Sequence, residues 1–182
     1  MGNSIGLIEL KSTPIGIQTA DEMIKSASVE LLLASPICPG KYVVIVSGNV
    51  GAVKSAMQVG IDTAGTFLVS DSIINNVHKD IPAAISGTSD SGEIKAIGAL
   101  ETISALTSIT AGDIAVKASN VRLIEIRIAR GLGGKGFVIF TGEISSVKSA
   151  VNACLTALKS SGEITSYSIL ASPHKDLIAQ IM

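Results

Sequence analysis

The sequence repeats itself, and the second half of the chain follows the pattern of the first. Residues 5–9 (IGLIE) return as residues 97–101 (IGALE) at an offset of 92. Residues 41–48 return as 135–142 at an offset of 94, and residues 78–80 (HKD) return as 174–176 at an offset of 96. A repeat that keeps both its beginning and its end predicts two similar domains. We place them at residues 1–90 and 91–182, joined at the polar segment 88–92.

Each half has the same order of expected elements. In the first half, the expected strands are short apolar runs rich in β-branched residues: 4–10, 29–37, 42–47 and a run that begins at 66–69. The expected helices are 19–27, with Asp21 in its first turn, 50–64, and a short one at 79–85. The order β-α-β-β-α-β plus a short C-terminal helix predicts a ferredoxin-like α+β domain, with two helices on one face of a sheet.

The composition indicates that such halves are not isolated domains but parts of a larger assembly. Hydrophobic residues make up 47% of the chain and charged residues only 16%, which predicts an oligomer whose contacts cover the sheet edges and the second sheet face. The formal net charge of -1 argues against a nucleic-acid binder. The sequence has neither an apolar run long enough to span a bilayer nor a signal peptide, so we expect a cytoplasmic protein without membrane contact.

Two cysteines are too few for a disulfide framework. Cys154 lies in the helical run 147–158 and is expected to be a small buried hydrophobe. Cys38 lies in the expected turn 38–40, and the counterpart segment 130–134 (RGLGG) has no sulfur. Because an iron-sulfur cluster uses about four thiolates, one such cysteine per chain serves a cluster only where symmetry gathers several chains. From the residues alone, the alternative is an unliganded cysteine in a turn.

Three glycines, Gly131, Gly133 and Gly136, have the spacing of a dinucleotide-binding loop. That loop needs a helix directly after it, whereas residues 137–140 (FVIF) predict a strand. We therefore interpret the glycines as a turn that crowds a symmetry axis. Arg130 beside them either adds a basic lining there or forms a salt bridge to a neighbour.

The sequence has no recognisable set of catalytic residues. His78 and His174 precede the short helices and are predicted to cap them. Glu9 and Glu101 recur within strands and are expected to be hydrogen-bonded parts of the scaffold. Without a nucleophile-base pair, zinc-ligand spacing or phosphate loop, the sequence predicts a protein that is not an enzyme.

The repeated motifs resemble the shell proteins of bacterial microcompartments, the BMC-domain family. Each half contains Gly-x-x-Glu, Asp-x-x-x-Lys, Val-Lys-Ser-Ala and His-Lys-Asp in the same order, and the resemblance covers nearly the entire chain. It implies a homotrimer of tandem domains that mimics a hexamer and tiles with other shell proteins into the microcompartment shell, around enzymes in the cytoplasm. It also implies that Lys25 and Lys117 lie at the tile edge, whereas the residues alone fit solvated helix ends equally well.

Residues 35–41 resemble the cysteine-bearing pore loop of propanediol-utilisation members of this family. The resemblance implies one 4Fe-4S cluster per trimer, held on the axis by Cys38 of each chain, and electron transfer across the shell with an encapsulated redox enzyme as a partner. The implied pore loops contain the following further residues: Ser35, Pro36, Ile37, Pro39, Gly40, Arg130, Gly131, Leu132, Gly133 and Gly134. The alternatives are a metabolite pore without a cluster and a trimer that binds a small regulatory ligand.

Overall fold

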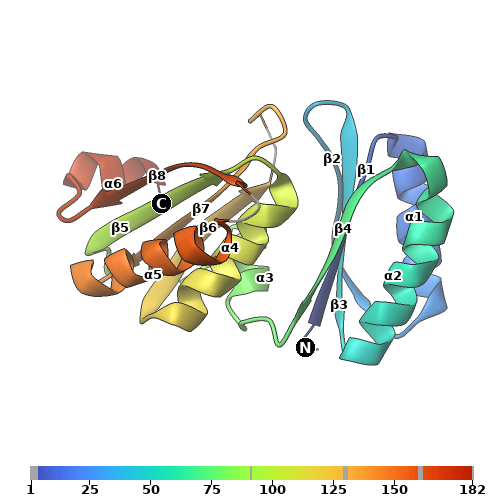
Figure 1. The fold of residues 1–182 in the computed structure, drawn as a ribbon, viewed down its shortest axis with the longest axis horizontal. Coiled ribbons are helices and arrows are strands. Elements are labelled where there is room, and N and C mark those ends of the chain that lie inside the picture. The colour runs from blue at the N-terminus through green and yellow to red at the C-terminus, as the bar shows by residue number, and fades with distance from the viewer. Residues whose placement is uncertain (1–3, 91, 129–130, 160–161, 182) are drawn as a thin grey trace. The chain divides into compact units, whose positions relative to one another are not determined.

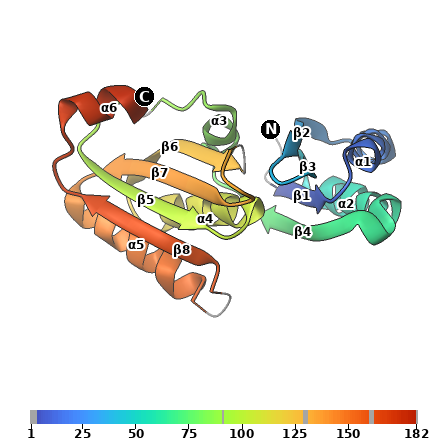
Figure 2. The same cartoon turned by 90° about the horizontal axis from the view of Figure 1, so that it is seen from above.

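A computed structural model describes residues 4–90, 92–128, 131–159 and 162–181 of the chain. It divides into two compact units, Met1–Val77 and His78–Met182. Each unit is built on a four-stranded antiparallel sheet with two long helices on one face (Figures 1 and 2). Within the described residues, no helix is long and apolar enough to cross a membrane.

The first unit has the predicted β-α-β-β-α-β order. Its strands are β1 (Ser4–Leu10), β2 (Glu30–Ile37), β3 (Lys41–Gly48) and β4 (Leu68–Asn75), arranged β2-β3-β1-β4 in the sheet. Its helices are α1 (Thr13–Ser26) and α2 (Val50–Ala64), followed by the 3-10 turn η1 (Gly65–Phe67). The bounds of β1 and α2 agree with the sequence prediction to the residue.

Helix α1 begins earlier than predicted, at Thr13 rather than at residue 19. Ser12 is its N-cap, and the Ser12 hydroxyl accepts a hydrogen bond from the backbone N of Ile15 at 3.5 Å. Pro14 occupies the first turn, where its missing N–H costs no helical hydrogen bond. The sequence predicted Asp21 in the first turn of the helix. Asp21 instead lies about one turn before the end of the helix and faces Lys25.

Small residues let the two helices of the first unit approach the sheet closely. A Cβ atom on Gly60 of α2 would lie 2.5 Å from Ile8 Cδ1 and 2.7 Å from Met23 Sδ, both in fully buried side chains. On the strand side, a Cβ atom on Gly6 would lie 2.6 Å from Met57 Sδ. The core between sheet and helices is thus packed without room for one more methyl group.

The second unit repeats this arrangement. Its strands are β5 (Ala96–Thr102), β6 (Val121–Ile128), β7 (Gly136–Gly142) and β8 (Ile164–Leu170), arranged β6-β7-β5-β8. Helices α4 (Ala105–Ala118) and α5 (Ile144–Ala157) cover one face of this sheet, and α6 (Lys175–Ile181) follows β8 (Figure 2). The predicted fold, two ferredoxin-like α+β domains in tandem, is confirmed.

The short helix α3 (Ile81–Ser86) ends the first sequence repeat but packs within the second unit. It contacts β6 and α4, and Ile81 and Ala84 are fully buried there. Gly87 ends the helix in the left-handed conformation, with φ of 68°. The compact units therefore divide after Val77, ahead of the polar segment at which the sequence repeat divides.

Candidate functional site

The turn between β2 and β3 presents the one exposed thiol of the described residues. Cys38, Pro39 and Gly40 are exposed, and the Cys38 thiol is free. Ser35, Pro36 and Ile37, which the resemblance assigned to the pore loop, lie in β2 and pair with β3, as the apolar pattern predicted. The turn itself is therefore confined to residues 38–40, at the end of a paired hairpin.

A partly buried ion pair fixes the base of this turn. Lys41 directly follows the turn, and its ammonium group lies 2.7 Å from Glu9 Oε1. The Glu9 side chain is only 1% exposed, and Ser70 donates a hydrogen bond to its second oxygen at 3.2 Å. Because a buried carboxylate needs such partners, Glu9 ties the turn to β1 and β4.

The equivalent turn between β6 and β7 is rich in glycine and has no sulfur. Gly131, Gly133 and Gly134 adopt φ values of 73°, 61° and 93°, which favour glycine. The backbone N of Lys135 donates to the Leu132 carbonyl at 3.2 Å and closes the turn, and strand β7 follows as predicted. Arg130 lies outside the described residues, so both interpretations of it stay predictions.

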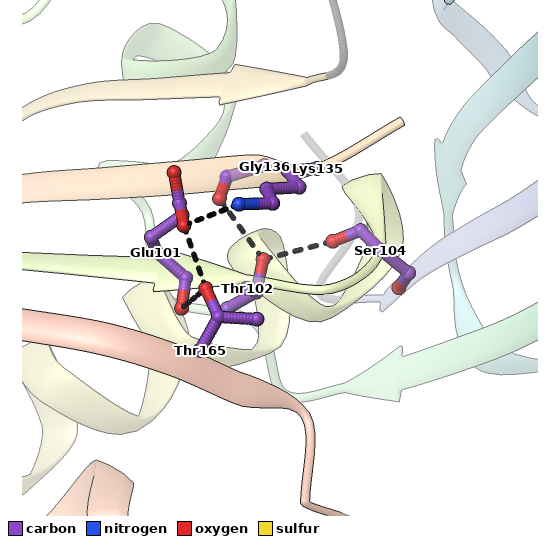
Figure 3. Close-up of polar contacts among 6 residues, drawn as sticks. All are labelled: Glu101, Thr102, Ser104, Lys135, Gly136 and Thr165. Atoms are coloured by element: carbon purple, nitrogen blue, oxygen red, sulfur yellow. Dashed lines mark hydrogen bonds and ion pairs between the residues drawn. The ribbon is translucent and has the colours of Figure 1, made fainter. Parts of the chain in front are cut away.

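A second Glu–Lys pair fixes the base of the glycine turn (Figure 3). Glu101 Oε1 lies 3.0 Å from Lys135 Nζ and accepts a hydrogen bond from the Thr165 hydroxyl at 2.7 Å. The Thr165 hydrogen bond and the Lys135 ammonium group lower the pKa of the Glu101 carboxyl below its usual value. Glu9 and Glu101 are thus scaffold residues, as predicted.

The sequence analysis did not identify Lys41 and Lys135 as the partners of these carboxylates. The signal was present, because Lys41 and Lys135 are equivalent in the repeat and each directly follows a turn. Antiparallel pairing places Glu9 beside β3, next to that lysine, and Glu101 beside β7 in the same way. A lysine repeated behind both turns therefore predicts two anchored turns.

Cys154 is fully buried, as predicted. Its thiol donates a hydrogen bond to the Ala111 carbonyl at 3.3 Å, and burial raises the pKa of this thiol to about 12. A thiol with so high a pKa stays protonated at neutral pH and is a poor metal ligand. Of the two cysteines, Cys38 is therefore the one available to a ligand.

His174 caps α6, as predicted, whereas the N-cap of α3 is Asp80, so the prediction that His78 caps this helix is wrong. Nδ1 of His174 accepts from the backbone N of Asp176 in the first turn of α6, at 3.3 Å. Nδ1 of His78 accepts from the backbone N of Asp80, just before α3, at 3.4 Å. The rings are thus engaged with backbone donors at the starts of the two short helices.

Lys25 and Lys117 lie in the last turns of α1 and α4. Each forms an ion pair with the aspartate one turn earlier, Asp21 and Asp113 respectively. The hydrogen bond to Asp21 raises the pKa of the Lys25 ammonium group. Their contact with neighbouring tiles stays a prediction.

In the part of the chain that the structure describes, the donor atoms do not make a metal site by themselves. Across the described ranges, no group of three or more His, Cys, Asp or Glu side chains converges. One chain thus offers a single exposed thiol on an anchored turn. Such a turn can complete a site only together with donors from other chains.

Comparison with known proteins agrees with the tandem fold. The BMC domain matches this chain twice, at residues 4–77 and 96–173. The chain belongs to the BMC-domain family. It is 37% identical to the bacterial microcompartment shell protein PduT of Citrobacter freundii over 182 residues, which is 100% of this chain and 99% of that protein.

Two further relatives extend the comparison. A microcompartment protein from Desulfitobacterium hafniense has a crystal structure that matches with a TM-score of 0.94 and 42% identity, covering 98% of this chain and 99% of that one. The carboxysome assembly protein CcmO of Synechococcus elongatus is 28% identical over 96% of this chain and 67% of its own length. This BMC protein is a structural component of a bacterial microcompartment shell, of the PduT type, and not an enzyme.

Proposed function

We propose that three copies of this BMC protein form one shell tile, in which the three Cys38 turns meet on the threefold axis and hold a 4Fe-4S cluster. The cluster carries electrons between the two sides of the shell, to or from an encapsulated redox enzyme. The observation that supports this most directly is the free, exposed Cys38 thiol at the tip of an anchored turn. The resemblance to family members with a cysteine-bearing pore loop supports it as well.

The residues of the chain fit such a group only in an assembly. Each chain supplies one thiolate, because Cys154 is buried and its pKa is about 12. Three Cys38 thiolates leave one iron of a 4Fe-4S cluster for water, a small thiol or a ligand from a partner. A bound cluster of this kind supplies electron transfer.

The remaining residues of the site have a positioning role. The Glu9–Lys41 ion pair and the buried side chains of Ile37 and Tyr42 hold the ends of the turn. Three sulfur atoms that share one cluster must be placed reproducibly, so a rigid base favours the site. The glycine turn of the second unit, which has no sulfur, then has no part in ligation.

Iron and acid-labile sulfide analysis of anaerobically purified protein tests this proposal. We expect the wild type to be brown, with about four irons per three chains, and we expect Cys38→Ser to be colourless and iron-free with its assembly unchanged. Cys154→Ala is the matched control, since it removes a sulfur atom that is not a ligand, and it should keep the iron. A wild type that stays iron-free after reconstitution contradicts the cluster and favours a metabolite pore, and equal iron in wild type and Cys38→Ser excludes Cys38 as a ligand.

A further inference from the structure

The second unit contains a polar pocket that the proposed function does not use. The pocket has a volume of about 250 Å³ and is formed by three segments that are far apart in the sequence. Its walls include Ser89, which follows α3, three residues of β6 and two residues of α6: Ile124, Glu125, Arg127, Gln180 and Ile181. A small concave site with apolar walls and a few convergent polar groups is the usual form of a binding site for a small molecule.

An ion pair inside this pocket has a fixed geometry. Arg127 donates from Nε and Nη2 to Glu125 Oε1, each at 2.7 Å. The guanidinium group also lies over the Phe137 ring, with its Cζ 5.1 Å from the ring centroid. Both bonds end on Oε1, and no described residue donates to Glu125 Oε2. The pair therefore adds no net charge to the pocket, and it presents an acceptor oxygen beside the remaining N–H donors of Arg127.

Two further polar groups belong to the pocket wall. The hydroxyl oxygen of Ser89 is buried and has no hydrogen-bond partner among the described residues. Buried polar groups in folded proteins are nearly always hydrogen-bonded, so this hydroxyl indicates a site that a small ligand completes. Gln180 adds a side-chain amide, which both donates and accepts hydrogen bonds.

The repeat shows that the fold does not require the ion pair. Leu33 of β2 is equivalent to Glu125, because the two residues pair with equivalent positions of the next strand. Ser35 is equivalent to Arg127 in the same way. The first unit thus forms the same sheet without a charge at either position. A pair that is present in the second unit alone, and in a pocket, favours a role in binding.

We propose that this pocket binds a short-chain neutral diol. One hydroxyl group of the diol donates to Glu125 Oε2, and the other accepts from the Arg127 guanidinium group. The hydrocarbon part contacts Ile124 and Ile181, which supply the apolar walls. A neutral ligand fits because the carboxylate and the guanidinium group already compensate each other, so a charged ligand would lose its hydration without a counter-charge.

This site goes beyond the proposed function and does not depend on the cluster. All its residues belong to the second unit, whereas Cys38 belongs to the first. Cys38→Ser should therefore bind the diol as the wild type does, and iron analysis does not report on the pocket. Failure of the diol site and failure of the cluster are thus distinguishable.

Methyl NMR of the whole assembled protein, labelled at the isoleucine Cδ1 groups, tests the proposal. Titration with butane-2,3-diol should shift the Ile124 and Ile181 signals along a saturable curve, with a dissociation constant on the order of 1–10 mM. The signals are assigned with Ile124→Val and Ile181→Val. Ile103, which is 59% exposed and not part of the pocket wall, should not shift. The charged analogues 3-aminobutan-2-ol and 3-hydroxybutyrate should bind at least about tenfold more weakly than the diol.

A double substitution tests the role of the ion pair. Glu125→Leu with Arg127→Ser introduces the residues that the first unit has at these positions, so the sheet should still form. We expect this variant to bind the diol at least about tenfold more weakly than the wild type. The matched control is Lys95→Asn with Glu143→Asn, which replaces a more exposed ion pair of the second unit by the residues of the first repeat. The control should bind the diol as the wild type does.

Three results overturn the proposal. They are Ile124 and Ile181 signals that do not shift or do not saturate, charged analogues that bind as tightly as the diol, and a double variant that binds like the wild type. Glu125→Gln keeps the shape of the side chain and removes the carboxylate, so it should also weaken binding. This variant decides the question if the double variant does not fold.

Discussion

Two helical glycines show how differently one residue type is constrained in this chain. Gly16 of α1 faces Tyr42, and a Cβ atom there would lie 2.3 Å from the ring carbon Cδ1. Gly51 near the start of α2 has open space, with Asn49 Oδ1 at 3.6 Å as its nearest neighbour. The first glycine is required by packing, whereas the second carries only the entropic cost of glycine in a helix.

We therefore expect opposite effects from the same substitution at these two positions. Gly16→Ala should lower the free energy of unfolding by about 1–3 kcal/mol through overpacking. Gly51→Ala should leave it unchanged or raise it by up to about 1 kcal/mol. Urea unfolding followed by circular dichroism measures both, and a Gly16→Ala variant as stable as Gly51→Ala would contradict the packing around Tyr42.

The lowered pKa of Glu101 predicts a pH dependence with a definite sign. A carboxyl whose folded-state pKa lies below its unfolded value stabilises the fold above that unfolded value, and loses this contribution as the pH falls through the folded pKa. Glu101→Gln should thus cost at most about 1 kcal/mol at neutral pH, because the pair with Lys135 is partly exposed.

The difference between wild type and Glu101→Gln should begin to shrink near the usual carboxyl value of 4.5 and disappear at lower pH. Thermal unfolding at a series of pH values measures it. A difference that stays constant from neutral pH to acid would show that Glu101 acts through its shape and not through its charge.

At the scale of elements, helix α1 shows why its start was missed in the sequence. Apolar spacing becomes regular only from Ala20 onward, whereas the true start is marked by Ser12 and Pro14, a capping residue and a first-turn proline. These signals were present and outweigh the irregular spacing. Strand β1 and helix α2 were predictable because their apolar patterns are uninterrupted between clear breaks.

Helix α3 shows what the repeat does not determine. The repeat identifies the helix, but it contains no information on the surface that the helix covers. Asp113 gave no signal as the acceptor for His78, because a hydrogen bond to a backbone N leaves no side-chain pattern at the donor. Packing partners of a short apolar helix are set by tertiary context and not by local sequence.

A substitution in α3 tests its placement in the second unit. Ile81→Ala should destabilise that unit by about 2–4 kcal/mol, because it leaves a cavity between α3 and α4. Hydrogen exchange should show lost protection in β6 and α4. Loss of protection confined to β1 and β3 would instead place α3 on the first unit.

At the scale of the whole molecule, duplication explains why so much of the fold was predictable. Because the pattern occurs twice, each element can be predicted from two segments of the sequence. The second unit has the same strand order as the first. The candidate site was less accessible to sequence analysis. Its anchors, Lys41 and Lys135, are recognised only once the strand pairing is known, and the proposed cluster would take only one ligand cysteine, Cys38, from each chain.

Native mass spectrometry of the anaerobically purified complex tests the central claim, a three-chain tile with one cluster bound through Cys38. The account predicts a particle of three chain masses plus one 4Fe-4S cluster for the wild type, and three chain masses alone for Cys38→Ser. A wild-type particle with any other number of chains, or three chains that carry the same added mass in both proteins, would contradict it.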